Sequence, residues 1–395
     1  MLANADLSVS NVRAAQRVPT NADDSKLVDI WYDLTASDAG TQQPVTISVR
    51  ISSDDGKTFG IPAKELRGAI GAGQGVGMNK LITWNAGVDW NLQVSPNIRF
   101  EVTSAVAPTV DDGLVLIPAG YFTMGDANSD GGSDELPLHN VWVSGFHLGK
   151  FEVSTGLWNQ VRTWALNASY TDLPIGNEVN ASKGDSHPVH SVSWYGVVKW
   201  CNAYSEMMNL APCYKVGEEI YRSGNSDAVA CDWTANGYRL PSEAEWERAA
   251  RGGLSEYRFP WSNTITHDHA NYRSVLLDLN PYDASLTRGY HPVWSGNDNG
   301  NYAYTAPVGS FEANGFGLHD TTGNLIEWCW DSYSSYTSFQ EIDPHGPASS
   351  DSARVIRGGG WAGDAYHSRT ACRDYETAAS SRNDVGFRVA RTAQP

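Results

Sequence analysis

The stretch from Arg251 to the C-terminus constrains the fold most, because it shows almost no repeating hydrophobic pattern. It is rich in Gly, Asn, Trp and Tyr, and the whole chain contains 38 Gly, 15 Trp and 18 Tyr. A long helix needs apolar residues repeated every 3.6 positions, and this stretch offers only short strand candidates, at residues 355–357 and 386–389. The sequence therefore predicts loop-rich structure held by buried aromatic side chains.

A chain of 395 residues exceeds the usual size of one domain, so we expect two domains with separate cores. In the first, short segments alternate apolar with polar residues between Gly, Asp and Asn turns. These segments are residues 27–34, 45–52, 81–84 and 98–102. The pattern predicts an immunoglobulin-like β-sandwich over residues 1–107, serving as a spacer or docking module, with a linker at residues 105–109.

Residues 114–395 form the second predicted domain, which makes the chain α+β with little regular secondary structure in its second part. Two apolar runs around a Pro/Gly turn favour a hairpin over residues 114–125. Helical periodicity follows in three segments, residues 154–161, 194–208 and 242–251. The last of these begins with Ser242 and Glu245 at capping-box spacing.

Charged residues near that last helix are interpreted as structural. Its acids are expected to be solvated or ion-paired and not catalytic, namely Glu243, Glu245 and Glu247. Three arginines in strand-like, aromatic-flanked contexts are expected to hold loop carbonyls and carboxylates, namely Arg239, Arg357 and Arg388.

Charge and hydropathy limit the partners. The formal net charge of −17 is spread along the chain and repels phosphate backbones, so we expect no nucleic-acid partner. No run of 18 apolar residues is present, so no transmembrane segment is expected. The first residues do not read as a leader segment, but an abrupt start before a β-rich chain is also what removal of an export signal leaves. We expect an exported protein, located in the periplasm, at the cell surface or outside the cell.

The chain has five cysteines, at positions 201, 213, 231, 329 and 372. None has CxxC spacing, which argues against zinc binding and dithiol exchange. Cys213 and Cys231 flank a loop and are expected either to form a disulfide or to be two buried free thiols. The odd count leaves at least one thiol unpaired.

A series of short motifs spans nearly all of residues 114–391. It includes Pro188-Val189-His190-Ser191-Val192-Ser193-Trp194 and Arg357-Gly358-Gly359-Gly360-Trp361, and further motifs at residues 117–120, 124–125, 152–154, 238–247, 314–318, 323–328 and 386–388. In this order they resemble the formylglycine-generating enzyme (sulfatase-modifying factor) family. The resemblance implies a C-type-lectin-like fold for the second domain.

Oxygen ligands suited to calcium gather between Asp320 and Glu327, where two carboxylates flank a Gly-containing turn. The alternative is a metal-free capped turn. The family resemblance implies a calcium site with side chains of Asp320 and Glu327 and carbonyls of Gly323 and Leu325. For the family's other calcium site, the matching positions are Asn271, Tyr272 and Asn299. His267-Asp268-His269 has the spacing of a transition-metal site, but loop polarity explains it more simply.

The resemblance also implies an oxidase chemistry that this sequence departs from. The family's enzyme makes formylglycine from a substrate cysteine with oxygen and copper(I), and the cuprous ion needs a close thiolate pair. Residues 360–368 contain no cysteine, and Cys372 aligns beyond the pair. Gly360 replaces the motif's serine, and Ile326 replaces an expected tryptophan. We therefore expect neither copper binding nor catalysis, with a formylglycine oxidase or related oxidoreductase as the alternative.

A binding protein is the function that remains. From Trp361 to Val385 the sequence mixes Arg and Ala positions with small, hydroxylated and aromatic residues that suit adaptable contact surfaces. The candidate ligand-binding residues are Trp361, Gly363, Asp364, Tyr366, His367, Ser368, Asp374, Tyr375, Thr377, Ser380, Asn383 and Asp384. This arrangement resembles the C-terminal variable region of proteins diversified by retroelements. We expect a non-catalytic protein that binds a protein or glycan ligand through this surface; a family member without diversification is the other interpretation.

Overall fold

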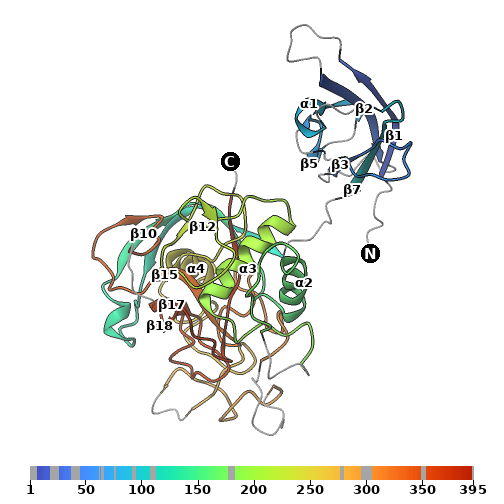
Figure 1. The fold of residues 1–395 in the computed structure, drawn as a ribbon. Coiled ribbons are helices and arrows are strands. Elements are labelled where there is room, and N and C mark those ends of the chain that lie inside the picture. Colours follow the sequence, from blue (N-terminus) through green and yellow to red (C-terminus); the bar gives the residue numbers. More distant parts are fainter. Residues whose placement is uncertain are drawn as a thin grey trace. The chain divides into compact units, whose positions relative to one another are not determined.

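The computed structural model describes residues 7–17, 26–36, 45–61, 63, 66–74, 77–90, 95–106, 113–176, 183–275, 280–294, 305–347 and 353–393. The chain divides into two compact units, Met1–Asp112 and Gly113–Pro395 (Figure 1). Within the described ranges, no helix combines the length and the apolar character that a membrane span requires.

Two antiparallel sheets form the N-terminal unit. The first has the order β1-β2-β6-β4, with strands Leu7–Gln16, Leu27–Ala36, Gly77–Asn85 and Leu66–Gly68. The second has the order β5-β3-β7, with strands Gly71–Gln74, Val45–Ser52 and Arg99–Val106. A short helix, α1 (Ala86–Asp89), follows β6.

Side chains from both sheets share one buried cluster, because apolar residues alternate along each strand. Its members are Ile30, Tyr32, Leu34, Ile47, Ile51, Ile82, Trp84 and Val102. Strands β2, β3, β6 and β7 overlap the four segments expected from the sequence, whereas the more polar β1 and the short β4 and β5 were missed. The immunoglobulin-like topology stays a prediction, and linker residues 107–109 lie outside the described residues.

The C-terminal unit is mixed α/β and rich in sheet, and its described residues include three α-helices. These are α2 (Thr155–Ala165), α3 (Trp194–Met207) and α4 (Glu243–Ala250). Each begins after a serine whose hydroxyl accepts a backbone N–H of the first turn, at Ser154, Ser193 and Ser242. The capping box of Ser242 with Glu245 is confirmed.

The described residues of this unit also form four small sheets. The first, β16-β10-β9, contains Glu341–Ile342, His139–Val143 and Gly120–Met124. The second, β20-β11-β8, contains Ala390–Thr392, Phe146–Gly149 and Leu114–Ile117. The third, β13-β12-β14, contains Glu219–Ile220, Tyr214–Val216 and Val229–Cys231. The fourth, β18-β17-β15-β19, contains Arg373–Thr377, Ala353–Arg357, Ile326–Ser332 and Val385–Gly386.

The hairpin expected over residues 114–125 is wrong. Strand β8 pairs with β11 and strand β9 pairs with β10, so the two neighbouring strands join different sheets. Ile117 and Met124, one from each strand, nevertheless pack into the same buried cluster. A local pattern shows that two strands exist, but tertiary packing decides which partners they take.

Aromatic side chains hold α2 against α3, which lie side by side in Figure 1. The rings of Trp158 and Trp200 stack with centroids 5.5 Å apart. Phe387, from the end of the chain, packs edge-on against both, at 6.0 and 5.4 Å. A residue near the C-terminus therefore completes the core between the two helices. Buried aromatic side chains hold this part of the chain, as its aromatic content predicts.

Buried arginine–glutamate pairs tie α4 to segments before and after it in the chain. Glu247 is fully buried and pairs with Arg251 at 2.7 Å and with Arg357 at the end of β17. Burial opposes its charge, but the two guanidinium groups outweigh burial and lower the pKa of Glu247. Glu245 holds Arg239 through two hydrogen bonds of 2.7 Å. The acids of α4 are thus ion-paired as predicted, whereas the solvated alternative is wrong.

Candidate functional site

The candidate binding residues lie on the loop between β17 and β18, on β18 itself, and on the turn before β19. Five of them are exposed and are called the display residues, namely His367, Asp374, Tyr375, Thr377 and Asn383. Four are partly exposed, namely Gly363, Asp364, Tyr366 and Ser380. The other three, Trp361, Ser368 and Asp384, are buried.

Trp361, Ser368 and Asp384 are therefore corrections to the predicted surface. The Ser368 side chain is 0 % exposed and its hydroxyl donates to the Asp364 carbonyl at 3.1 Å. The Trp361 indole is 8 % exposed and its N–H donates to the Asn383 carbonyl at 3.3 Å. Trp361 and Ser368 hold the loops in place, which residue type alone did not reveal.

Six buried positions of the same segment are called the anchor residues, namely Ala365, Arg369, Ala371, Cys372, Arg373 and Ala378. Arg369 forms two hydrogen bonds of 2.7 Å with Glu135. Arg373 holds Glu243, at the start of α4, with hydrogen bonds of 2.7 and 2.6 Å. Bidentate pairs of this kind fix position and orientation together. The buried anchor residues therefore hold the segment in place, whichever side chains occupy its exposed positions.

Asp364 organises the loop between β17 and β18. Its Oδ1 accepts a hydrogen bond from the Tyr366 amide at 3.1 Å and contacts His367 Nδ1 at 2.7 Å. The hydrogen bond to Asp364 raises the pKa of His367. Burial opposes the charge of Asp364, but the hydrogen bond from His367 helps to lower its pKa. Gly359 has φ +67°, and a Cβ there would lie 2.8 Å from the His367 carbonyl oxygen, so the loop requires glycine.

Strand β18 lies at the edge of its sheet, because β17 is its one recorded partner among the described strands. Two of its backbone amides donate to the side chain of the preceding residue. The Tyr375 amide donates to the Asp374 carboxylate at 2.7 Å, and the Thr377 amide donates to the Glu376 carboxylate at 2.8 Å. These hydrogen bonds compete with pairing to another strand. The edge therefore presents side chains more readily than backbone groups.

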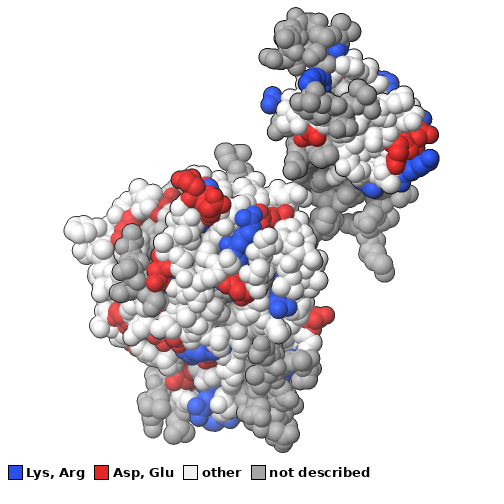
Figure 2. Space-filling view, viewed as in Figure 1, with Lys and Arg blue, Asp and Glu red and all other residues white. Residues whose placement is uncertain are grey.

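Two aromatic residues outside the predicted set, Tyr333 and Tyr290, lie next to predicted residues. Tyr375 is 53 % exposed, and its ring centroid lies 4.7 Å from that of Tyr333, whose hydroxyl donates to Asp134. Tyr290 is 38 % exposed, 5.9 Å from Trp361. Sequence reasoning missed these residues, although their aromatic character was a usable signal. On the face drawn in Figure 2, Lys and Arg atoms form small groups interspersed with Asp and Glu atoms.

The two carboxylates predicted to bind calcium differ in their hydrogen bonding: one oxygen of Asp320 has no partner, whereas both oxygens of Glu327 do. Asp320 is 5 % exposed; its Oδ2 accepts the Gly309 amide at 2.6 Å, while its buried Oδ1 has no hydrogen-bond partner. Glu327 instead holds Arg388 at 2.6 and 2.7 Å and accepts the Trp246 indole N–H at 2.7 Å. The orphaned oxygen of Asp320 fits a cation, whereas the occupied carboxylate of Glu327 does not.

Glu152, which was not assigned to the site, lies beside these groups. Its carboxylate accepts the Asn324 side chain at 2.6 Å and the Leu325 amide at 2.9 Å. Burial, followed by the negative charges of Asp320 and Glu327, raises its pKa well above the usual range. Burial also raises the pKa of Asp320 to about 6. Glu152 lies in the motif at residues 152–154, which was the available signal.

The second predicted calcium site stays a prediction, because the described part of the chain contains only two of its three positions. The Asn271 amide donates to Asn324 Oδ1 at 3.1 Å, and its backbone pairs with Gly323. The Tyr272 hydroxyl donates to Asp283 at 2.6 Å, and Asn299 lies outside the described residues. Among the described residues, no group of three or more Asp, Glu, His or Cys side chains could hold a metal ion. His267 and His269 are among these described residues and belong to no such group.

All five cysteines are free thiols, so the disulfide alternative for Cys213 and Cys231 is wrong. Both lie in the sheet formed by β12 and β14 or next to it, and burial raises the pKa of Cys213 to about 11. Burial also raises the pKa of Cys372 to about 12, so this thiol stays protonated at neutral pH. A protonated, buried thiol is a poor nucleophile and a poor copper(I) ligand.

The sheet-rich core, the three capped helices and the fastened C-terminal segment define a scaffold of the formylglycine-generating-enzyme type. The chain belongs to the Sulfatase-modifying factor enzyme 1-like domain family, whose profile matches residues 100–393. The match begins inside β7 of the N-terminal unit.

Relatives within this family carry different names. The chain is 31% identical to the chaperone protein LppX of Paenibacillus barcinonensis over 291 residues, which are 72% of this chain and 91% of LppX. It is also 31% identical to the formylglycine-generating enzyme of Mus musculus over 308 residues, which are 74% of this chain and 79% of the enzyme. Among solved structures, Treponema denticola variable protein 1 is 28% identical with a TM-score of 0.54, covering 71% of this chain and 95% of that one.

Proposed function

We propose that the C-terminal unit is a non-catalytic ligand-binding module that presents the display residues on a formylglycine-generating-enzyme-like scaffold. The observation that carries this proposal is the separation of display residues from anchor residues within one short segment. The likeness to a variable protein of Treponema denticola supports it. The small, hydroxylated and aromatic character of the set suits a protein or glycan ligand.

Retroelement diversification of this segment is the finer form of the proposal. It requires that the displayed side chains change while the anchors stay, which the burial pattern allows. A near-copy of the DNA encoding residues 354–391, beside a reverse transcriptase gene and differing at adenines, would support it. Absence of such a copy from the complete genome would favour a binding module with a fixed surface.

The binding proposal is tested by selection. A surface-displayed library randomised at His367, Asp374, Tyr375, Thr377 and Asn383 is sorted against a set of unrelated proteins and glycans. We expect most members to fold and some to bind. A matched library randomised at Ala365, Arg369 and Arg373 is the control, and we expect it to lose folded members. Failure of the first library to yield binders, although its members fold, would contradict the proposal.

A formylglycine oxidase is the second candidate, because relatives that are 31% identical carry that name. Against it stand the missing cysteine pair of residues 360–368 and the buried, protonated thiol of Cys372. The test is mass spectrometry of a Cys-x-Pro-x-Arg peptide incubated in air with the copper-loaded protein. Conversion of the thiol to an aldehyde, beside an active control enzyme, would establish the oxidase.

We also propose that a calcium ion binds near Asp320, since its orphaned oxygen and the adjacent Glu152 form an acidic site without a salt bridge among the described residues. The ion would supply positive charge that holds the loop around Asn324. Glu327 would act indirectly, by positioning Arg388. Export of the protein and an immunoglobulin-like N-terminal unit remain predictions.

A further inference from the structure

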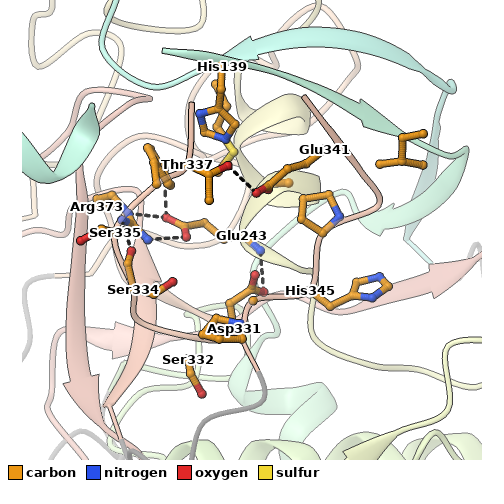
Figure 3. A pocket seen from close by; sticks show the side chains of 17 residues that line it. His139, Glu243, Asp331, Ser332, Ser334, Ser335, Thr337, Glu341, His345 and Arg373 are labelled. Atoms are coloured by element: carbon orange, nitrogen blue, oxygen red, sulfur yellow. Dashed lines mark hydrogen bonds and ion pairs between the residues drawn. The ribbon is translucent and has the colours of Figure 1, made fainter. Parts of the chain in front are cut away.

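A cavity of about 460 Å³ lies where β10, β16, the start of α4 and the chain after β15 meet. Figure 3 shows His139 on one side of it and Asp331 with Ser332 on the other. Its volume lies in the range of small-molecule sites. Of the candidate binding and calcium-ligating residues, none lines it.

Three carboxylates and one guanidinium line this cavity, namely Glu243, Asp331, Glu341 and Arg373. The charge of Glu243 is compensated, because Arg373 holds both of its oxygens and the Tyr336 hydroxyl donates to one of them at 3.2 Å. Arg373 also donates hydrogen bonds to the backbone carbonyls of Asp134 and Ser334. The carboxylates of Asp331 and Glu341 are left without a salt bridge among the described residues.

Asp331 is the more buried of the two carboxylates in the cavity that lack a salt bridge among the described residues. Its side chain is 4 % exposed, and the Glu243 amide, at 2.9 Å from Oδ2, is its one recorded donor in the described part of the chain. Burial and then the charge of Glu243 raise its pKa well above the usual range, and Glu245 adds to this while Arg373 opposes it. A buried carboxyl of this kind gains most from a cationic partner.

The other polar groups of the cavity also favour a ligand that donates hydrogen bonds. His139 Nδ1 lies 3.0 Å from the Pro137 carbonyl, so in the neutral ring this nitrogen carries the proton and Nε2 accepts. Burial lowers the pKa of His345, which keeps that ring neutral at pH 7 and removes repulsion of a cation. Met124, Tyr336 and Ile342 supply apolar walls. An acceptor-rich, partly apolar cavity suits an alkyl chain that ends in a cation.

We propose that this cavity binds a small organic cation, whose ammonium or guanidinium group pairs with Asp331 and is attracted by Glu341. The site goes beyond the proposed display function and does not depend on it. The cation can belong to a free amine or to a lysine or arginine side chain of a protein, since both have the same chemistry.

The test is isothermal titration calorimetry of the full chain with butylguanidine and butylammonium. We expect both to bind and the uncharged isostere N-butylacetamide to bind at least about tenfold more weakly, since removing one member of a buried charge pair costs that much or more. Absence of binding by both cations at millimolar concentration, or equal binding of the neutral isostere, would overturn the proposal.

Variants locate the site. Asp331→Asn keeps an oxygen for the Glu243 amide but removes the charge, and we expect about tenfold weaker binding of butylguanidine. Glu341 is half-buried, so Glu341→Gln carries less risk to folding, and we expect a smaller loss of affinity in the same direction. Glu312→Gln, at an exposed acid that does not line the cavity, is the matched control. Unchanged binding by both cavity variants would overturn the assignment.

The source of the cation is distinguished with a blocked peptide, acetyl-Gly-Arg-Gly-amide. Binding as tight as that of butylguanidine, and weakened by Asp331→Asn, supports a protein side chain as the natural occupant. Binding of butylguanidine without the peptide supports a free small molecule. Peptide binding that is insensitive to Asp331→Asn would contradict this cavity as its site.

Discussion

The two sides of the segment from Trp361 to Val385 differ in burial and in how firmly their side chains are held. On the buried side, Arg369 and Arg373 each hold a glutamate through two hydrogen bonds. On the outer side, the side chains of Tyr375, Thr377 and Asn383 are exposed. A loop-rich segment can therefore keep a fixed position through its anchor residues while its exposed side chains vary.

The largest effect is expected on the buried side. Arg369→Ala leaves Glu135 charged and buried, which should cost about 3–5 kcal/mol of unfolding free energy. Arg382→Ala, whose side chain is 39% exposed, is the control and should cost less than about 1 kcal/mol. Both are measured by urea unfolding. Equal losses would remove the distinction between anchored and displayed positions.

A buried carboxylate without its own arginine should behave in the opposite way. The pKa of Asp320 is raised to about 6, so the folded state binds more protons than the unfolded state between about pH 4 and pH 6, and stability falls as pH rises through that window. In chelator at pH 7, Asp320→Asn should therefore stabilise the protein by about 1–3 kcal/mol.

In calcium, we expect the wild type to be more stable than the Asp320→Asn variant, the reverse of the order in chelator. An ion that binds the folded state raises its unfolding free energy, by about 2.7 kcal/mol at a concentration 100 times the dissociation constant, and the Asp320→Asn variant should lose most of this gain. Thermal unfolding in calcium and in chelator measures both effects. Identical melting temperatures in the two buffers would exclude calcium and leave Asp320 as an unpaired acid.

A smaller effect is expected at the loop between β17 and β18. The raised pKa of His367 means that its hydrogen bond to Asp364 contributes fully below the unfolded pKa and is lost as pH rises through the folded one. Because the His367 side chain is 53% exposed, the contribution should stay below about 1 kcal/mol. Unfolding of His367→Gln and wild type between pH 5 and pH 8 checks this. A pH dependence that is unchanged in the variant would assign it elsewhere.

The smallest effects are expected on the outer side. Tyr375→Ala, Thr377→Ala and Asn383→Ala should each change the unfolding free energy by about 0.5 kcal/mol or less, because these side chains are exposed. The same urea titrations measure them. A loss above about 2 kcal/mol at any of the three would show that it is an anchor.

Local rules in the sequence predicted the helices and several structural ion pairs. Ser242 with Glu245 marked the start of α4, and the arginine contexts indicated that Arg239 and Arg388 hold carboxylates. Such features depend on neighbours in sequence or on one residue's chemistry, so they are readable without a structure.

Features set by distant contacts were harder to predict. The pairing of β8 with β11, the burial of Ser368 and the commitment of Glu327 to Arg388 depend on chain segments far apart in sequence. Glu152 was missed as a partner of Asp320 for the same reason, since 168 positions separate them. Residue type indicated oxygen ligands, but only the fold shows which oxygens are free.

The most direct test is a mutational scan of residues 361–385 on displayed protein, scoring each substitution for folding by protease resistance. We expect broad tolerance at the display residues, with strong loss at Arg369, Arg373, Ala365 and Ala378. Uniform intolerance along the segment, or tolerance that does not follow burial, would contradict the claim that anchoring and display are separate.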